Sequence, residues 1–479
     1  MPADKDDPSA RDSRPAKAST ETPGETPGEA PGETPGPVSR RSFLGGAAAG
    51  VIAGVGASYG LQRVLDDEAA AVVAQQAGPA SSTPSTLVAP QAEPVPPPSG
   101  PLGLPGPFPG KVIETHHPGA VRDAVRDRAA VRAMMDRGMS ALVGTDDAVE
   151  AWRHLFSPGD RVGIKVVPVG APHSISSFEV VLEVIEGLVA AGVRKRDILV
   201  FERYKLGGTG LVKVGYPDIL PDGVHWECSS VEYDDAQLEL SGQLPGRGHE
   251  DHIAGYDRDV YRELAYCQPA PIHDPKDDRR LRSHLSTIVT RKVDKFISIP
   301  VLKDHNSAGI TLSLKNLSHG LVNNVARSHM RIPGRDRDGR GGTLNQCGTF
   351  IPTIVSLPPI REKAVLQILD GLVATYEGGP STWRPTFSTW ERGSLFFATD
   401  PVALDHIGWE IIDEERAARG WPPVAKMGLM ADRGTREIAN QVSEEPFHSR
   451  QPQHVPLAGT LGLGVFERDQ IDYSRIELS

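Results

Sequence analysis

The chain has 479 residues and a formal charge of −11, with 24% charged and 39% hydrophobic residues. This composition is typical of a soluble globular protein with polar appendages, and it allows one large hydrophobic core or two modest ones. The negative charge excludes nucleic acid as an expected partner, because that affinity comes mainly from clustered Lys and Arg that neutralise phosphates.

The first segment, residues 1–38, carries the repeat ETPGETPGEAPGETPGP. A sequence of Pro, Gly and Glu buries too little apolar surface to offset the entropy lost on ordering. We therefore expect residues 1–38 to be disordered.

Residues 39–71 resemble an export signal. The stretch SRRSFL, with Arg40 and Arg41, is similar to the motif read by the twin-arginine translocase, and the apolar run 44–61 behind it is rich in Gly and Ala. Ala69–Ala71 offers a cleavage site. The resemblance implies the translocase as a partner during export and an extracytoplasmic location. Without cleavage, the segment leaves an N-terminal membrane anchor. The alternative is a chance arginine pair before a short anchor helix.

Residues 72–109 are rich in Pro and Ser and indicate an extended tether, so the folded domain is expected to span 110–479. Within it, RVGIKVVPV at 161–169 predicts a strand, 176–191 a helix, and DILVF at 197–201 the next strand. This βαβ unit predicts an α/β fold with a mostly parallel sheet covered by helices.

Capping signals accompany these elements. Ser176 and Glu179 fit a capping box at the start of the first helix, and Gly192 fits its C-terminal stop. Asp400 and Pro401 predict the N-cap and first residue of a later helix. Further strands are predicted at the following ranges: 295–302, 364–369 and 395–399.

Charged residues recur where the predicted strands end. The chain leaves these strands at Glu202, Lys303, Asp370 and Asp400, while Lys165 lies inside the first strand. In an open α/β sheet, ligands bind beyond the carboxyl ends of the strands, so we expect one shared crevice there. The alternative for each residue alone is an ordinary polar position at the start of a loop.

The motifs also resemble a known family. GIKV at 163–166, ISIPVLKDH at 297–305, SLKNLSHG at 313–320, ILDG at 368–371 and DPVALD at 400–405 are similar to the domain of unknown function 362 family. The resemblance covers about 163–405, with a polar insertion at about 205–290. It implies an α/β domain with a shared polar site, and it implies no particular reaction.

We predict that the crevice takes a small anion. Lysine ammonium groups pair with phosphate or carboxylate, and an amide or carboxylate orients the bound molecule. The predicted catalytic residues are Lys165, Lys303 and Lys315; the predicted substrate-binding residues are Asn316, Glu202 and Glu377. Lys315 on a solvated face is the alternative.

One divalent metal ion is the expected cofactor, because carboxylate oxygens suit Mg²⁺ or Ca²⁺ and added imidazole suits a transition metal. The predicted ligands are Asp370, Asp400 and His305; Asp405, His319 and His329 are further candidates. For Asp400 the alternative is a helix cap, and for Asp405 an ion pair. No histidine pair has a tight ligand spacing.

The three cysteines, Cys228, Cys267 and Cys347, lie far apart. Without C-x-x-C spacing, an iron–sulfur cluster is not expected, although some family relatives carry one. One disulfide and three free thiols both remain open.

Three functions fit these observations. The first is an exported metal-assisted enzyme acting on a small anionic substrate. The second is a non-catalytic periplasmic binding or scaffolding protein that uses the same crevice. The third is a redox protein without an iron–sulfur cluster.

Overall fold

The computed structural model describes the following residues: 101–207, 209–231, 255–263, 282–325, 328, 346–382, 386–427 and 450–479. The predicted disordered segment 1–38, the signal with Arg40 and Arg41, Cys267 and His329 all lie outside these ranges. Inside them, no helix combines the length and apolar character needed to cross a membrane. Cys228 and Cys347 are free thiols.

Among the described residues, ten strands form one sheet, in the order β14-β1-β13-β12-β9-β4-β5-β6, with β10 beside β12 and β11 beside β10. Their bounds are β1 Lys111–His116, β4 Val162–Lys165, β5 Ile198–Tyr204, β6 His225–Ser230, β9 Lys295–Ser298, β10 Val301–His305, β11 Gly309–Ile310, β12 Ala364–Glu377, β13 Ser388–Ala398 and β14 Asp472–Glu477. Two small sheets pair β2 Val121–Arg122 with β3 Val125–Arg126, and β7 Tyr256–Glu263 with β8 Arg282–Ser286.

The half of the sheet from β12 to β6 is parallel. β4 pairs in parallel with β5 and β9, β12 with β9 and β10, and β5 with β6. β13 is antiparallel to β12 and β1. The predicted α/β fold with a mostly parallel sheet is therefore confirmed, and the carboxyl ends of β4, β5 and β10 share one edge.

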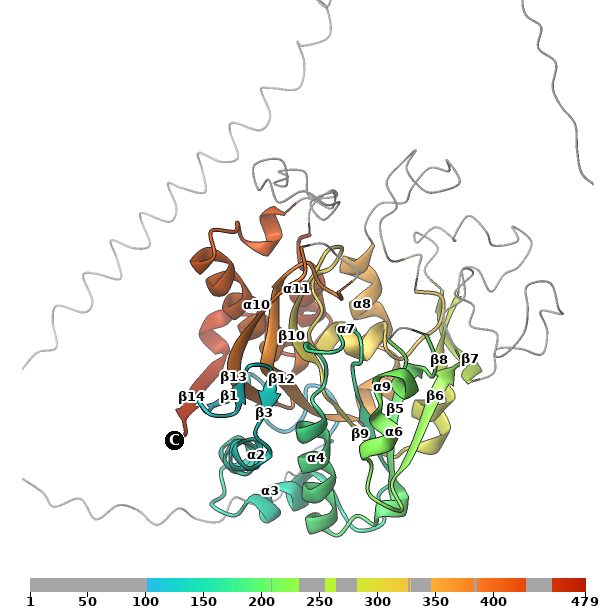
Figure 1. Ribbon diagram of the computed structural model, residues 1–479. Coiled ribbons are helices and arrows are strands. Elements are labelled where there is room, and N and C mark those ends of the chain that lie inside the picture. The colour runs from blue at the N-terminus through green and yellow to red at the C-terminus, as the bar shows by residue number, and fades with distance from the viewer. Residues whose placement is uncertain are drawn as a thin grey trace, which may run out of the picture. The chain divides into compact units, whose positions relative to one another are not determined.

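Helices cover both faces of the sheet (Figure 1). Their bounds are α2 Arg128–Val143, α3 Ala148–Leu155, α4 Phe178–Ala191, α5 Leu211–Val214, α6 Tyr216–Ile219, α7 Ser313–Ser318, α8 Cys347–Val355, α9 Pro358–Lys363, α10 Pro401–Ala418 and α11 His454–Thr460, with shorter turns at η1 Lys195–Asp197, η3 Ile288–Lys292, η5 Val424–Lys426 and η8 Arg468–Gln470.

Two hydrophobic clusters form the core, one on each face. Ile297 and Ile368 pack with α2, α3 and α4, whereas their neighbours Phe296 and Leu369 pack with α7, α8, α10 and α11. Successive side chains in a strand point to opposite faces, so both faces of these strands are buried and the strands read as continuous apolar runs.

Several element boundaries differ from those expected. The strand predicted at 295–302 is two strands, β9 and β10, separated around Pro300, which has no N–H to donate to a ladder. The capping box is wrong: Ser177 is the N-cap of α4, and the Ser176 hydroxyl instead donates to the Ile299 carbonyl at 2.6 Å. The Gly192 stop is confirmed, with φ of 105°.

Two predicted segment boundaries also shift. The end of the predicted tether packs on the domain, because Leu104 is buried and its N–H donates to the Arg361 carbonyl at 2.7 Å. Part of the predicted insertion at 205–290 belongs to the main sheet, since β6 pairs with β5 along its length.

Candidate functional site

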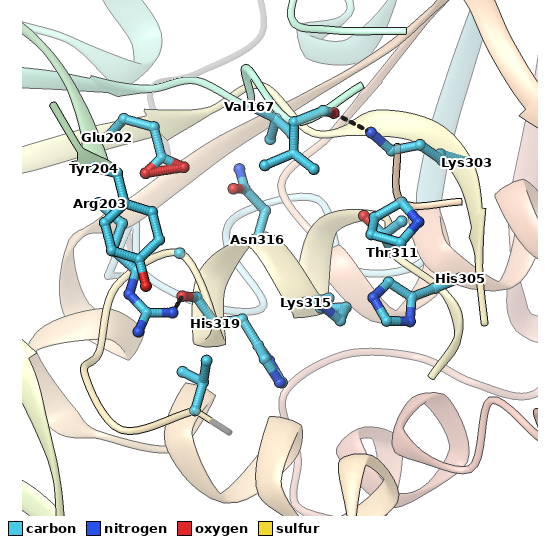
Figure 2. Close-up of a pocket in the computed structure, with 14 residues that line it drawn as sticks. Val167, Glu202, Arg203, Tyr204, Lys303, His305, Thr311, Lys315, Asn316 and His319 are labelled. Carbon is cyan, nitrogen blue, oxygen red and sulfur yellow. Dashed lines mark hydrogen bonds between the residues drawn. The ribbon is translucent and has the colours of Figure 1, made fainter. Parts of the chain in front are cut away.

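A pocket of about 260 Å³ opens at the carboxyl edge of the parallel strands (Figure 2). Its polar lining comes from three places: β5, β10 and the segment from Thr311 through α7 to His319. The lining residues are Val167, Val169, Glu202, Arg203, Tyr204, Lys303, His305, Thr311, Lys315, Asn316, His319, Gly320, Val325 and Pro380. Of the four charged residues at the predicted strand ends, Glu202 and Lys303 line this pocket, whereas Asp370 and Asp400 do not.

Five of the predicted site residues line this pocket: Glu202, Lys303, His305, Lys315 and Asn316. Lys165 lies directly behind it, with hydrogen bonds to two of them. Its ammonium donates to Glu202 Oε1 at 3.1 Å and to Asn316 Oδ1 at 3.0 Å, as well as to the Val166 carbonyl at 2.8 Å. Burial lowers the pKa of Lys165 and raises that of Glu202. Lys165 thus connects β5 and α7, the two elements that carry Glu202 and Asn316, behind the pocket.

Lys303 is fully buried on β10 and is also bound to the backbone. Its ammonium donates to the carbonyl of Val169 and, at 3.2 Å, to that of Ser174. Burial lowers its pKa to about 7, and the nearby Lys315 lowers it too, against the opposing effect of Asp304. Both bonds tie the loop after β4 to β10, so Lys303 shapes the pocket as well as lining it.

Lys315 differs from the other two lysines. It is half-buried on α7, and among the residues that the structure describes no hydrogen bond or ion pair involves its ammonium group. Burial lowers its pKa to about 8; Arg203 lowers it further, and the Cys347 thiol acts in the opposite direction. Of the three lysines at the site, Lys315 is therefore the one whose charge has neither a counter-ion nor a hydrogen-bond acceptor among the described residues.

α7 is a single short helix, so other elements must hold it in place. The carboxylate of Asp405, on α10, accepts hydrogen bonds from the backbone N–H groups of Ser313 at 2.6 Å and Leu314 at 2.9 Å. Asn316 donates to the Ser298 hydroxyl at 2.9 Å. Asp405 therefore acts on the site by capping the helix that carries Lys315, and burial raises its pKa to about 8.

The two histidines of the pocket are oriented by neighbours. His305 Nδ1 accepts from the N–H groups of Ser307 at 3.0 Å and Ala308 at 3.2 Å, which places its proton on Nε2. His319 Nε2 and the Ser328 hydroxyl share a hydrogen bond at 2.7 Å.

Glu377, predicted to bind substrate, lies elsewhere. Its carboxylate is fully buried between two guanidinium groups, with Arg416 Nη1 at 2.6 Å and Arg450 Nη1 at 3.1 Å. Burial opposes its ionisation, but Arg450 and Arg416 outweigh this and lower the pKa of Glu377. Asp304 completes this ion network at 3.5 Å from Arg450. The role of Glu377 here is structural.

The carboxylates of two predicted metal ligands, Asp370 and Asp400, accept hydrogen bonds from backbone N–H groups. Asp370 accepts from Ser177 N–H at 2.7 Å and Leu372 N–H at 3.0 Å. Asp400 caps α10, as the alternative reading has it, and also accepts from Gly110 and Val465.

Across the described ranges, no three His, Cys, Asp or Glu side chains are grouped to hold a metal ion. His305 lines the pocket, and Asp370 and Asp400 do not. The three predicted ligands are thus not brought together there, and a bound divalent metal stays a prediction.

Arg203 and Tyr204, which were not among the residues predicted from sequence, line the pocket from the end of β5. Arg203 Nη1 donates to the His319 carbonyl at 3.3 Å, bridging β5 and the residue after α7. Their position in the sequence could have indicated this role, because both directly follow Glu202 in the stretch FERY. In the structure, β5 continues to Tyr204.

Comparisons with known proteins add the following. Residues 242–410 match the family described as "Domain of unknown function (DUF362)", which supports the predicted resemblance. This match covers less than half of the chain; it includes Lys303 and Lys315 but not Lys165 or Glu202. The family description names no activity.

A crystal structure of a Thermotoga maritima protein, a Northeast Structural Genomics Consortium target, is similar to 62% of this chain with 10% identity and a TM-score of 0.34. The chain spans 60% of that protein, and a likeness this weak carries no argument. No curated protein matches.

Proposed function

We propose that the protein binds a small anion, a carboxylate or a phosphate monoester, with Lys315 as the principal counter-charge. The observation that carries this proposal is the uncompensated Lys315 ammonium in the pocket. Lys165 has Glu202 as its counter-ion, and Lys303 has two carbonyl acceptors. A bound anion would satisfy Lys315 in surroundings where charge interactions are stronger than in water.

The remaining lining supports the same class of ligand. Arg203, Lys303 and Lys315 contribute positive charge, and Glu202, already paired with Lys165, is the one carboxylate among the described lining residues. The volume of about 260 Å³ lies below the usual range for drug-sized ligands. A molecule of a few carbon atoms fits this space better than a nucleotide.

An enzyme acting on the bound anion is the second candidate. It is favoured by the two amines, Lys303 and Lys315, whose pKa values of about 7 and 8 allow proton exchange near neutral pH. Turnover of the anion, measured with and without added divalent metal, distinguishes an enzyme from a binding protein.

Affinity for an anion should fall as the pH rises through the pKa of Lys315. The ammonium is charged below about pH 8. Above that pH, the association constant should drop about tenfold per pH unit as the cation is lost. Sulfate is the suitable probe because its charge does not change between pH 6.5 and 9.5, a range that isothermal titration calorimetry can cover.

The neighbouring Cys347 thiol stays neutral over this range, because burial raises its pKa to about 11. Lys303, with its pKa of about 7, adds a smaller loss at lower pH, since it faces two backbone carbonyls. A sulfate affinity that does not change between pH 7 and 9.5 would count against Lys315 as the counter-charge.

We also propose that the protein is exported by the twin-arginine translocase, on the strength of SRRSFL and the apolar run behind it. In cells with an active translocase, the full chain should reach the exported fraction. Replacing Arg40 and Arg41 by lysine should retain it in the cytoplasm, as fractionation and immunoblotting would show. The matched control replaces Arg11 and Arg14; export that survives loss of Arg40 and Arg41 contradicts the proposal.

A further inference from the structure

Glu202 leaves one of its two carboxylate oxygens unused. Oε1 accepts from the Lys165 ammonium at 3.1 Å. Oε2 is buried and has no hydrogen-bond partner of good geometry among the residues that the structure describes, although the backbone N–H of Tyr204 also acts on the carboxylate and lowers its pKa. Glu202 lines the pocket with 7% of its surface exposed. A buried acceptor without a donor is costly, and each such group in a folded protein calls for an explanation.

The nearest cation cannot supply the missing donor. The Lys165 ammonium has three N–H groups, and all three are used: by Glu202 Oε1, by Asn316 Oδ1 at 3.0 Å and by the Val166 carbonyl at 2.8 Å. The Lys165 ammonium therefore has no N–H group left to donate to Oε2. A molecule in the pocket is in a position to provide it.

The two unused groups lie apart within the same pocket. Figure 2 shows the Glu202 carboxylate and Lys315 on either side of Asn316. One end of the pocket offers an acceptor and the other a cationic donor. The terminal carboxylate torsion of Glu202 is broad, so Oε2 can change its direction at little energetic cost.

We infer that the ligand is a hydroxylated anion, whose acidic group pairs with Lys315 and whose hydroxyl donates to Glu202 Oε2. This inference rests on the proposed function and narrows it. A ligand ammonium group would also donate, but Lys165 already neutralises Glu202 and the pocket carries the further cations Arg203 and Lys303. A neutral hydroxyl avoids this repulsion.

Matched probes test the inference on the unaltered full chain by isothermal titration calorimetry. For a carboxylate ligand they are 3-hydroxybutanoate, butanoate and 3-aminobutanoate; for a phosphate ligand they are glycerol 3-phosphate and n-propyl phosphate. In at least one of these two series, the hydroxylated member should bind about 10- to 150-fold more tightly than its deoxy partner, the range expected for a hydrogen bond to a charged group. The aminated member should bind more weakly than the hydroxylated one.

The variant Glu202→Gln should remove most of this preference, measured as the ratio of the affinities for the hydroxylated and deoxy probes in the same variant. Because Glu202→Gln leaves Lys165 buried without a counter-ion, the double variant Lys165→Met/Glu202→Gln, which removes both charges, provides a second test if the single variant unfolds. Retention of the full hydroxyl preference in a folded variant overturns the role of Glu202.

The other outcomes separate the two proposals. Equal affinity for hydroxylated and deoxy probes, with both lost in Lys315→Met, overturns the inference and leaves the proposed anion binding in place. Tighter binding of the aminated probe also overturns the inference. If none of the probes binds, the proposed function and the inference both fail.

Discussion

Replacing Glu377 by glutamine should reduce the free energy of unfolding by about 3–5 kcal/mol, the usual cost of removing one partner from a buried ion network. The side chains of Glu377, Arg416 and Arg450 are all fully buried. Burial and the nearby Glu377 raise the pKa of Asp304 to about 7, so Glu377 is the main counter-charge of both guanidinium groups at neutral pH. Denaturant unfolding followed by circular dichroism would measure the loss.

The control is Glu410→Gln. Glu410 pairs with Arg468 at 3.0 Å, but both side chains are exposed, so this change should cost less than about 1 kcal/mol. If Glu377→Gln costs no more than the control, the network does not stabilise the fold. Loss of anion binding with unchanged stability would instead restore Glu377 to the role expected from sequence.

Replacing Lys315 by methionine should weaken anion binding by about 10- to 150-fold, with little change in stability. No hydrogen bond or ion pair with another described residue depends on its ammonium group, and methionine keeps the apolar stem of the side chain. Loss of a charge-assisted contact is worth about 1.5–3 kcal/mol, or roughly 10- to 150-fold in affinity. Calorimetry with sulfate measures the affinity, and thermal unfolding measures the stability.

Lys213→Met is the matched control, because Lys213 is an exposed lysine on α5 and does not line the pocket. It should leave the sulfate affinity unchanged. Equal losses in the two variants would indicate a general effect of net charge rather than a site at Lys315. A large drop in melting temperature for Lys315→Met alone would mean that this lysine is structural.

The sequence predicted those features that depend on local signals. Asp400 and Pro401 start α10 as expected, because capping involves only the next three residues. The strand ends also indicated two pocket residues, Glu202 and Lys303, since the carboxyl ends of parallel strands meet at one edge. Lys303 was found in this way and Lys315 from its lysine-containing motif SLKNLSHG, but the difference in hydrogen bonding between the two lysines was not predicted.

Partners that are distant in the sequence could not be predicted. Asp370 accepts from the N–H of Ser177, which is 193 residues away. Glu377 meets Arg416 and Arg450, which lie 39 and 73 residues further along the chain. A carboxylate that satisfies backbone or guanidinium groups looks the same in sequence as one that binds substrate or metal. The roles of Asp370 and Glu377 therefore required the fold.

The most direct test of anion binding is a crystal structure of the full chain grown with selenate, a tetrahedral dianion whose selenium is located by anomalous scattering. We expect a selenium peak in the pocket, with a selenate oxygen within hydrogen-bond distance of Lys315 Nζ, and no such peak in Lys315→Met. Selenate bound only elsewhere on the protein, with the pocket of the unaltered chain free of it, would show that Lys315 does not form an anion site.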